Sequence, residues 1–472
     1  MGNISSLILQ DKGHSHIIKA AGGVADKIDM NAYLVGGYVR DCLLHRKNYD
    51  IDIVVEGNGE TFANELAKVL GISTVVDYNR FGTYAIPHPE IDIEIATARR
   101  ESYTPDTRKP DVEFCSIDED ISRRDFTINA IAASIRSSDF GRLLDPYKGI
   151  QDLQKGIIMT PLDPDITFSD DPLRILRALR FAAQLDFSIA SNVLDSITRT
   201  KDRLNIISWE RIRDELIKSL RADKPSIAFY LMKEVGLLGY VFPELDIMSG
   251  VEKIDGKGHK DVFIHTLQVV DNAAELTDKM EIRFAALVHD IAKPQTKKYY
   301  PDRGWTFHGH EEIGKRMMIG IAKRLKLSNE LRDYLMSMIK LHLRPIALAK
   351  EGVTDTAIRR IMNEAGDDID DLMTLCRADI TTKNPSKVRR YMKNFEKVEE
   401  LMKDVKLRDE MKMFQSPVRG HEIMKMFNLS EGPEIGRIKG IIEDAILDGD
   451  VQNDYDSVYS YILKNKNSLE AS

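Results

Sequence analysis

The sequence predicts an α/β (α+β) domain with a small mixed sheet, followed by an all-helical region that fills the rest of the chain. Two observations support this division. Between residues 32 and 95, short apolar runs with period-two alternation are separated by turns, as in strands. From residue 171 onward, apolar residues return every three or four positions, as in amphipathic helices. At 472 residues, the chain is long enough for about three or four domains.

The composition is that of an ordinary soluble globular protein. The net charge of -8 argues against a nonspecific polyanion binder, so any contact with RNA must come from local basic patches, and no DNA partner is expected. Cys42, Cys115 and Cys376 are scattered, which indicates reduced thiols. No run approaches the length of a membrane span. We therefore expect a cytoplasmic protein with no membrane partner.

The first motif is a glycine turn after an apolar strand, in residues 34–41 (Leu-Val-Gly-Gly-Tyr-Val-Arg-Asp). Gly36 and Gly37 permit a tight turn with free backbone N–H groups, which suits the oxygens of a triphosphate. Arg40 follows in the first helical turn, where a guanidinium can reach phosphate. Such a glycine pair is also common in turns without a function, so the motif needs support from its neighbours.

That support comes from Asp50 and Asp52 on the next predicted strand. The period-two pleat puts both carboxylates on one face, and two hard oxygen ligands suit Mg2+. Asp92 and Glu94 share a face of a later strand and are expected either near the metals or on a solvent-exposed edge. Helices are expected at residues 15–30 and 59–70, and further strands at 73–77, 83–86 and 91–95.

Together these residues resemble the nucleotidyltransferase core of the tRNA nucleotidyltransferase and bacterial poly(A) polymerase family, also called class II CCA-adding enzymes. The resemblance implies that Asp50 and Asp52 hold two Mg2+ ions for nucleotide transfer. It also implies tRNA as the acceptor and CTP and ATP as the donors. Residues 99–121 match a loop that helps such enzymes switch from C to A addition, and its full length favours complete CCA addition.

A second motif, beginning with Arg123, Arg124 and Asp125, is predicted to open a helix. Two arginines in a first helical turn oppose the macrodipole and therefore indicate an anionic partner, although a solvated basic turn is equally compatible. By resemblance to the family, Arg124 contacts the nucleotide.

A basic helix is predicted to begin at Asp171. Its apolar residues form one face, Arg174 and Arg177 point away from that face, and Asp171 and Arg180 lie near its edges. The alternative is a solvated basic face. Cytosine and adenine both present an amine donor beside a ring-nitrogen acceptor, so a carboxylate with a guanidinium matches both and rejects uracil and guanine. We call Asp171 and Arg174 the template pair.

Arg177 and Arg180 would then support the triphosphate or hold the template pair in place. The family's fourth motif has this role by resemblance, although Asp170 stands where the family usually has glutamate. Residues 209–216 resemble the fifth motif, and their charges are expected to form pairs within their own helix.

Histidines and aspartates concentrate after residue 259. Their order resembles the HD phosphohydrolase superfamily, which implies a divalent metal of unidentified type and a phosphatase or cyclic phosphodiesterase activity. The alternative is a domain retained as a scaffold. The ligands implied are His265, His289, Asp290 and Asp379, with His310 and His342 as additional ligands.

We expect four domains: a nucleotidyltransferase head (1–155), a helical neck carrying the template pair and an RNA-binding region (156–250), an HD domain (251–380) and a helical tail (381–472). Basic residues between 383 and 393 either guide tRNA or form a solvated helix. The alternatives to CCA addition are a poly(A) polymerase, an enzyme restricted to A or CC addition, an HD phosphohydrolase acting on nucleotides or RNA ends, and a noncatalytic RNA-binding protein. The sequence does not predict an oligomeric state.

Overall fold

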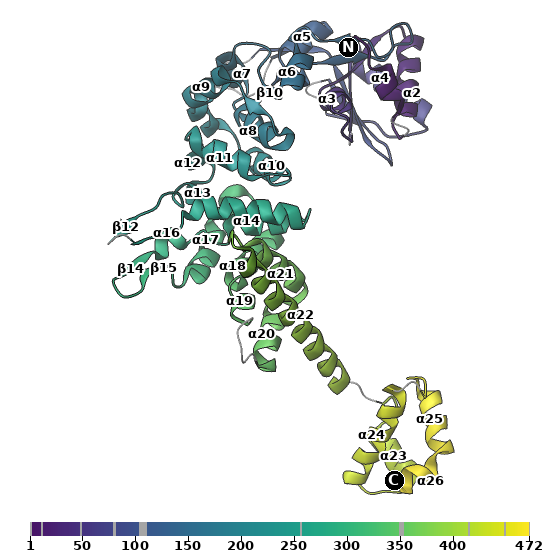
Figure 1. Ribbon diagram of the computed structural model, residues 1–472. Coiled ribbons are helices and arrows are strands. Elements are labelled where there is room, and N and C mark those ends of the chain that lie inside the picture. Colours follow the sequence, from purple (N-terminus) through teal and green to yellow (C-terminus); the bar gives the residue numbers. More distant parts are fainter. Residues whose placement is uncertain are drawn as a thin grey trace. The chain divides into compact units, whose positions relative to one another are not determined.

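The computed structural model describes residues 2–10, 13–47, 50–78, 82–102, 111–254, 257–348, 354–413, 416–447 and 450–471. The chain divides into two compact units, Met1–Leu343 with Asp370–Lys383, and Arg344–Ile369 with Asn384–Ser472. Figure 1 shows the main sheet near the N-terminus and a long helical remainder, which confirms the predicted fold class. No helix in the described ranges is long and apolar enough to cross a membrane.

The head is built on a seven-stranded mixed sheet with the order β3-β4-β5-β2-β1-β8-β9. Its central strands β2 and β5 are parallel, and every other neighbouring pair is antiparallel. The strands are β1 (Asn31–Val35), β2 (Asp50–Glu56), β3 (Val76–Asp77), β4 (Thr83–Pro87), β5 (Asp92–Thr97), β8 (Ala132–Ser134) and β9 (Leu143–Leu144). The helices of the head are α1 (Ser5–Gln10), α2 (Ser15–Lys27), α3 (Gly37–Leu43), α4 (Gly59–Leu70), α5 (Ile117–Ser122), η1 (Thr127–Asn129) and α6 (Gly149–Lys155).

Two expectations for the sheet are corrected. The strand expected at 73–77 pairs only at Val76–Asp77, and the short strands β8 and β9 were not expected from the sequence. The predicted loop at 99–121 contains a hairpin of β6 (Arg99–Ser102) and β7 (Asp111–Phe114), while residues 103–110 lie outside the described residues. Register between strands depends on tertiary pairing, so such short segments carry little sequence signal.

The prediction that Arg123 and Arg124 open a helix is wrong. They follow the last turn of α5, and Arg123 is its C-terminal cap. Positive charge is favourable at a helix C-terminus, so the macrodipole argument for an anionic partner no longer holds. The partner that the structure provides is the buried carboxylate of Asp120, which both arginines contact.

The neck is helical. Its basic helix α8 begins at Leu173, two residues later than expected, because Asp171 is extended and accepts a hydrogen bond from the Leu173 N–H at 3.1 Å. Helix α8 packs against α10 and α11. The elements are β10 (Ile157–Ile158), α7 (Pro164–Asp170), α8 (Leu173–Leu185), β11 (Ser188–Ile189), α9 (Ser191–Thr200), η2 (Lys201–Ile206), α10 (Trp209–Leu220), α11 (Ser226–Glu234), α12 (Leu238–Val241) and α13 (Pro243–Asp246).

The remainder of the first unit carries the histidine cluster. The chain enters this region through the short hairpin of β12 and β13. The elements are β12 (Lys253–Ile254), β13 (Lys257–Gly258), α14 (Val262–Leu276), α15 (Met280–Val288), α16 (Lys293–Thr296), β14 (Lys298–Tyr300), β15 (Gly304–Thr306), α17 (His310–Leu325), α18 (Asn329–Leu341) and α21 (Ile369–Ala378).

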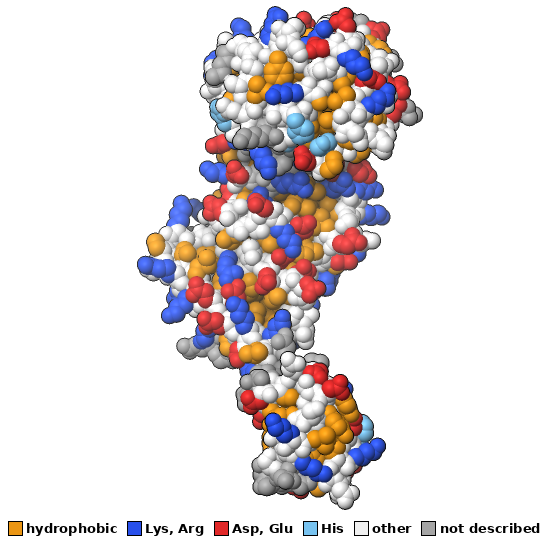
Figure 2. Space-filling view, turned by 90° about the vertical axis from the view of Figure 1, so that its right-hand side faces the viewer, with side chains coloured by type: hydrophobic (Ala, Val, Ile, Leu, Met, Phe, Trp, Pro, Cys, Tyr) orange, Lys and Arg blue, Asp and Glu red, His pale blue; other side chains and the backbone are white. Residues whose placement is uncertain are grey.

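The second unit is wholly helical in its described residues. Near the C-terminus it has an apolar core of its own, which includes Val418, Ile438 and Ile462. Its elements are α19 (Arg344–Leu348), α20 (Asp355–Ala365), η3 (Gly366–Asp368), α22 (Pro385–Met413), α23 (Gly420–Phe427), α24 (Pro433–Leu447), α25 (Tyr455–Lys464) and α26 (Lys466–Ala471). Figure 2 shows basic and acidic side chains interspersed over much of one face of the molecule.

Candidate active sites

The carboxylates of Asp50 and Asp52 lie at the start of β2. Ile51 and Ile53 alternate with them and are buried, so the pleat directs both carboxylates to the opposite face of the sheet. The parallel neighbour β5 places Glu94 beside Asp52 in register. The same register places Asp92 beside Asp50, so four carboxylates share this part of the sheet, including Asp92 and Glu94, whose places were left open by the sequence.

The charge of this cluster is poorly compensated. Burial, followed by the charge of Asp50, raises the pKa of Asp52 to about 7, against a smaller opposing effect of Arg124. Burial also raises the pKa values of Asp50 and Glu94, and neighbouring carboxylates add to both effects. Oxygen ligands held together at such a cost fit a divalent cation.

We expect cation binding at Asp50 and Asp52 to release a proton near neutral pH. Below pH 7, Asp52 holds a proton in the metal-free protein, so cation affinity should fall as the pH drops from 8 to 6. Titration calorimetry with Mg2+ in buffers of different ionisation enthalpy measures the proton release. The Asp52→Asn variant is the control and should release no proton at this site. An affinity that stays constant over this pH range would contradict the prediction.

The glycine turn lies directly against these carboxylates. Gly36 has φ 64° and ψ -127°, a conformation that only glycine adopts readily. A Cβ atom at this position would lie 3.1 Å from Nη1 of Arg124 and 3.6 Å from Oδ2 of Asp52. The missing side chain therefore leaves a space that is bordered by the turn, the guanidinium of Arg124 and the carboxylate of Asp52.

Replacing Gly36 with alanine should reduce nucleotide transfer. The substitution imposes a strained backbone worth about 1–3 kcal/mol and crowds Arg124, so we expect a loss in kcat/KM of about tenfold or more. Gly71→Ala is the matched control, because Gly71 has φ 71° but no atom of the described residues lies within 4 Å of an added Cβ. It should lower the Tm without changing transfer; equal kinetic effects in both variants would contradict the role of Gly36.

Arg40 and Arg124 approach this site in different ways. Arg40 is buried, donates to both carboxylate oxygens of Asp41 at 2.8 Å and donates to Oδ1 of Asn129 at 2.8 Å. Its guanidinium is thus held rigidly behind the turn. Arg124 is partly exposed and donates to Asp120 at 3.0 Å.

The template pair lies where the neck meets the head. Asp171 accepts a hydrogen bond from Nη2 of Arg211 at 2.9 Å, in addition to the bond from the Leu173 N–H. Arg174 is buried and donates from Nη2 to the Arg123 carbonyl oxygen at 2.7 Å. Both groups are thereby oriented, and Arg211 belongs to the motif that the sequence assigned to structure alone.

Arg177 and Arg180 are bound by buried carboxylates. Arg177 donates to Oδ2 of Asp125 at 2.8 Å, and the pKa of Asp125 is lowered to about 2, because Arg177 and other donors outweigh its burial. Arg180 pairs with Glu215 of α10 at 2.7 Å. The expectation that the charges of residues 209–216 pair within their helix is therefore wrong for Glu215 and Arg211, whose shortest contacts cross to neighbouring segments.

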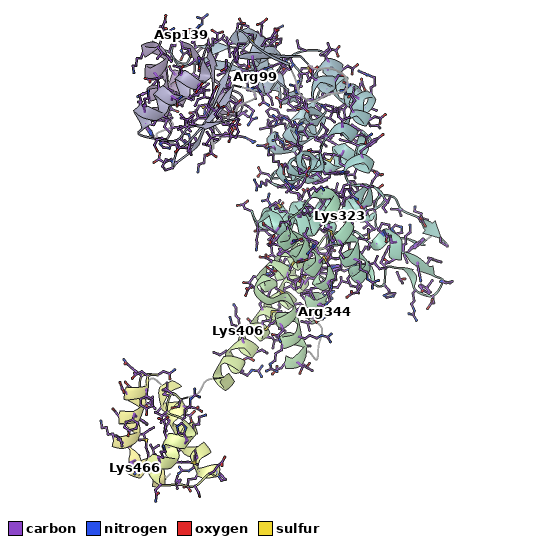
Figure 3. The ribbon with its side chains drawn as sticks, turned by 180° about the vertical axis from the view of Figure 1, so that it is seen from behind. Arg99, Asp139, Lys323, Arg344, Lys406 and Lys466 are labelled. Atoms are coloured by element: carbon purple, nitrogen blue, oxygen red, sulfur yellow. The ribbon has the colours of Figure 1, made fainter. Side chains whose placement is uncertain are left out.

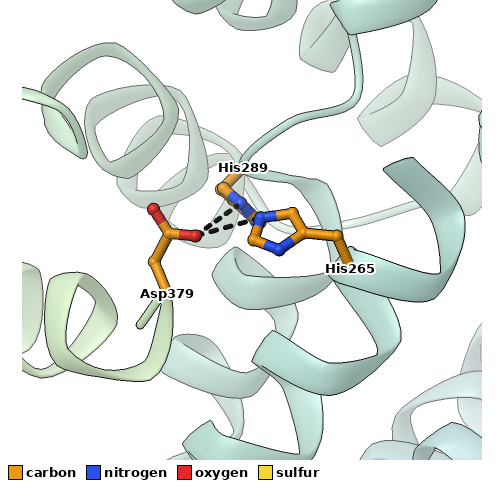
Figure 4. Close-up of side chains that lie close together, drawn as sticks. All are labelled: His265, His289 and Asp379. Atoms are coloured by element: carbon orange, nitrogen blue, oxygen red, sulfur yellow. Dashed lines mark ion pairs between the residues drawn. The ribbon is translucent and has the colours of Figure 1, made fainter. Parts of the chain in front are cut away.

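The six histidines and aspartates of the predicted HD site converge, although they come from segments up to 114 residues apart (265 to 379). One group comprises His265, His289 and Asp379, and a second comprises Asp290, His310 and His342. Figure 4 shows the first group, in which Nε2 of His265 lies 3.0 Å and Nε2 of His289 lies 3.7 Å from Oδ1 of Asp379.

Asp290 connects the two groups. Its Oδ2 lies 3.1 Å from Nε2 of His289 and 3.4 Å from Nε2 of His265, and its Oδ1 lies 3.3 Å from Nε2 of His310. Oδ1 of Asp290 and Nε2 of His289 are buried and make no well-formed hydrogen bond within the described part of the chain. Imidazole and carboxylate ligands with unsatisfied buried atoms fit a divalent metal.

The protonation states reflect the same crowding. Carboxylates around His265 raise its pKa to about 9 despite burial, whereas burial and His289 lower the pKa of His342 to about 4. Lys293 pairs with Oδ2 of Asp290 at 2.5 Å and was not singled out in the sequence, although it follows Asp290 by one helical turn. A pocket of about 350 Å³ adjoins the centre and is lined by Lys260, Val262, His265, Lys293, Phe307 and Asp379.

Comparison with known proteins agrees with these sites. Residues 32–159 match the Poly A polymerase head domain, residues 186–248 match the probable RNA and SrmB-binding site of polymerase A, and residues 262–384 match the HD domain. A "Multifunctional CCA protein" from Psychromonas ingrahamii is 36% identical over 316 residues, which are 64% of this chain and 72% of that protein. The chain belongs to the family of CCA-adding enzymes and bacterial poly(A) polymerases.

Solved structures of the family share its fold. The apo form II of a CCA-adding enzyme is 24% identical, with a TM-score of 0.59 over 98% of this chain and 99% of that chain. A tRNA nucleotidyltransferase complexed with a primer tRNA and an incoming ATP analog is 25% identical, with a TM-score of 0.57 over 80% of this chain and 99% of that chain. The family resemblance of the sequence is thus confirmed, and the protein is a nucleotidyltransferase with an appended HD domain.

Proposed function

We propose that this chain adds C, C and A to the 3′ end of tRNA from CTP and ATP, with release of pyrophosphate. The observation that carries the proposal is the meeting of Asp52, the Gly36 turn and Arg124 where β1 ends and β2 begins, within the sheet. Mg2+ held by Asp50 and Asp52 would supply the charge neutralisation that in-line attack on the α-phosphorus requires.

The residues around the carboxylates would bind and orient the nucleotide. The N–H groups of Gly36 and Gly37 would donate to the triphosphate, and Arg124, which borders the same turn, would donate to it as well. Arg40 adds positive potential from behind the turn, where Asp41 and Asn129 fix its guanidinium. The acceptor hydroxyl of tRNA is then held in line with the leaving pyrophosphate.

The template pair would select the base. The carboxylate of Asp171 has lone pairs beyond those used by Arg211 and Leu173, and these accept the amine of cytosine or adenine. Nη2 of Arg174 donates to the Arg123 carbonyl and Nη1 donates to the Thr167 carbonyl, and the remaining N–H groups of the guanidinium would donate to the adjacent ring nitrogen. Arg177 and Arg180 brace the helix through Asp125 and Glu215.

The test measures incorporation of each labelled nucleotide, with Mg2+, into three tRNAs: one lacking the whole terminal triplet, one lacking only the final A, and one complete. Addition of C, C and A followed by a stop supports the proposal. Unlimited addition of A would indicate a poly(A) polymerase, A addition only to the second tRNA an A-adding enzyme, and CC alone a CC-adding enzyme. Incorporation of none would leave the HD centre as the main activity.

We further propose that the HD centre is a metal-dependent phosphohydrolase. The buried, unsatisfied atoms of His289 and Asp290 favour this second function over a scaffold. A divalent metal there would activate water for attack on a phosphoester. The chain's own residues would hold that metal, and Lys293 and Lys260 would attract the phosphate into the adjoining pocket.

Several details stay predictions. The four domain boundaries, the cytoplasmic location and tRNA contact by the basic residues of α22 rest on the sequence. Residues 79–83 lack the two adjacent basic residues that we associate with poly(A) polymerases, which favours CCA addition. Residues 79–81 of this segment lie outside the described part of the chain.

A further inference from the structure

A fully buried carboxylate lies outside the proposed catalytic set. Asp120, in the last turn of α5, has no exposed surface. Its Oδ1 accepts from Nη2 of Arg123 at 2.6 Å and its Oδ2 accepts from Nη2 of Arg124 at 3.0 Å. The two guanidinium groups together keep the pKa of Asp120 low, although burial alone would raise it.

One of these arginines faces the metal carboxylates. Nη1 of Arg124 and Oδ2 of Asp52 both border the Gly36 turn, 3.1 Å and 3.6 Å from the place that a Cβ atom would take there. Weakening the pair with Asp120 would free Arg124 to turn toward the carboxylate of Asp52. The pair with Asp120 therefore limits how far the charge of Arg124 neutralises the proposed metal ligand.

The other arginine faces the template pair. The backbone carbonyl of Arg123 accepts the hydrogen bond from Arg174 at 2.7 Å, and its side chain donates from Nε to the Arg99 carbonyl at 2.8 Å. Arg99, labelled in Figure 3, begins β6, and its N–H donates to Asp120 at 3.3 Å. Asp120 thus fixes the peptide on which Arg174 rests.

We propose that Asp120 is a positioning residue for both halves of the nucleotide site: it keeps Arg124 off Asp52 and fixes the Arg123 carbonyl that orients Arg174. Figure 3 shows Arg99 within the head, and Arg174 comes from α8 of the neck. A second series of hydrogen bonds also links the head to the neck, and it runs from Arg40 through Asn129 and Asp125 to Arg177. Asp120 differs from that series because its single carboxylate binds both Arg124, which borders the Gly36 turn with Asp52, and Arg123, whose carbonyl binds Arg174.

The inference rests on the proposed function and is tested with Asp120→Asn. An amide leaves two guanidinium groups with one acceptor oxygen and no charge. We expect the Mg2+ concentration for half-maximal transfer to rise about tenfold, since charge-assisted hydrogen bonds of this kind are lost. We also expect selectivity for CTP over UTP to fall about tenfold, since Arg174 loses its fixed acceptor.

The matched control is Asp26→Asn, which removes a carboxylate of α2 that pairs with Arg136 elsewhere in the head. A merely structural role for Asp120 would lower the Tm and kcat while leaving both the Mg2+ requirement and the CTP to UTP ratio unchanged. That outcome, in a folded variant, would overturn the inference. If Asp120→Asn does not fold, Arg123→Lys replaces it, and the same drop in selectivity is expected.

Calorimetric binding of CTP and UTP, with and without Mg2+, separates this inference from the proposed function. Wild-type protein that binds CTP in preference to UTP but adds nothing to tRNA would contradict the proposed function, and the variants would still decide the role of Asp120. Wild-type protein that completes CCA, with variants of unchanged Mg2+ dependence and selectivity, would overturn the role of Asp120 alone.

Discussion

The Asp52→Asn variant should lose nucleotide transfer almost completely while remaining folded. Asparagine keeps the size of the side chain but removes the carboxylate that would bind the metal. Burial and the charge of Asp50 raise the pKa of this carboxylate to about 7. Metal ions contribute several kcal/mol to stabilising the charge of a transition state, so we expect kcat to fall by about a thousandfold or more. Single-turnover incorporation of CTP measures the loss, and Asp50→Ala should behave in the same way.

The stability of Asp52→Asn provides an independent check. The pKa of Asp52 in the folded protein, about 7, lies above its ordinary value of 3.8, so the metal-free folded state binds a proton that the unfolded state has released. Stability associated with this group is present at low pH and is lost as the pH rises through 7. The variant should therefore have a higher Tm than metal-free wild type at pH 8. Exposed Glu60 of α4 supplies the control: Glu60→Gln should retain transfer, and substantial transfer by Asp52→Asn would refute the assignment.

The Asp290→Asn variant should abolish metal binding and hydrolysis at the HD centre. Asp290 is the residue whose two oxygens reach both groups of ligands, so its loss affects both. Removing one partner from a buried charged cluster also leaves several imidazoles without their acceptor. Metal content by mass spectrometry and hydrolysis of phosphomonoesters and cyclic phosphodiesters with added divalent metals should both fall to background.

Nucleotide transfer from CTP and ATP to tRNA by Asp290→Asn should remain within about twofold of wild type. The ligands of the HD centre come from different segments than Asp50 and Asp52 of β2, and distant sites usually contribute independently. Asp302→Asn is the control for the HD centre, since Asp302 lies exposed at the turn between β14 and β15. Full metal binding by Asp290→Asn would show that the cluster is a scaffold. Loss of transfer together with hydrolysis would show that the two centres are not independent.

Local sequence patterns determined much of the fold. The alternation that places Asp50 and Asp52 opposite Ile51 and Ile53 is a property of any strand, and helix α4 has the bounds Gly59–Leu70 that were expected from its periodicity. The order of histidines and aspartates after residue 259 likewise identified the six residues that converge. These features were predictable because they depend on residue spacing along one element.

Tertiary structure decided which charges meet. Glu94 reaches Asp52 only because β5 pairs in parallel with β2, and Asp171 is oriented by Arg211, forty residues away in sequence. Arg123 and Arg124 were placed at the wrong end of a helix, because the buried acceptor Asp120 and the pairing of the preceding hairpin are not visible as a local pattern. Ion pairs between distant segments follow from packing, so the sequence by itself predicted the residues of the two proposed sites, and only the folded chain determined the partners that orient them.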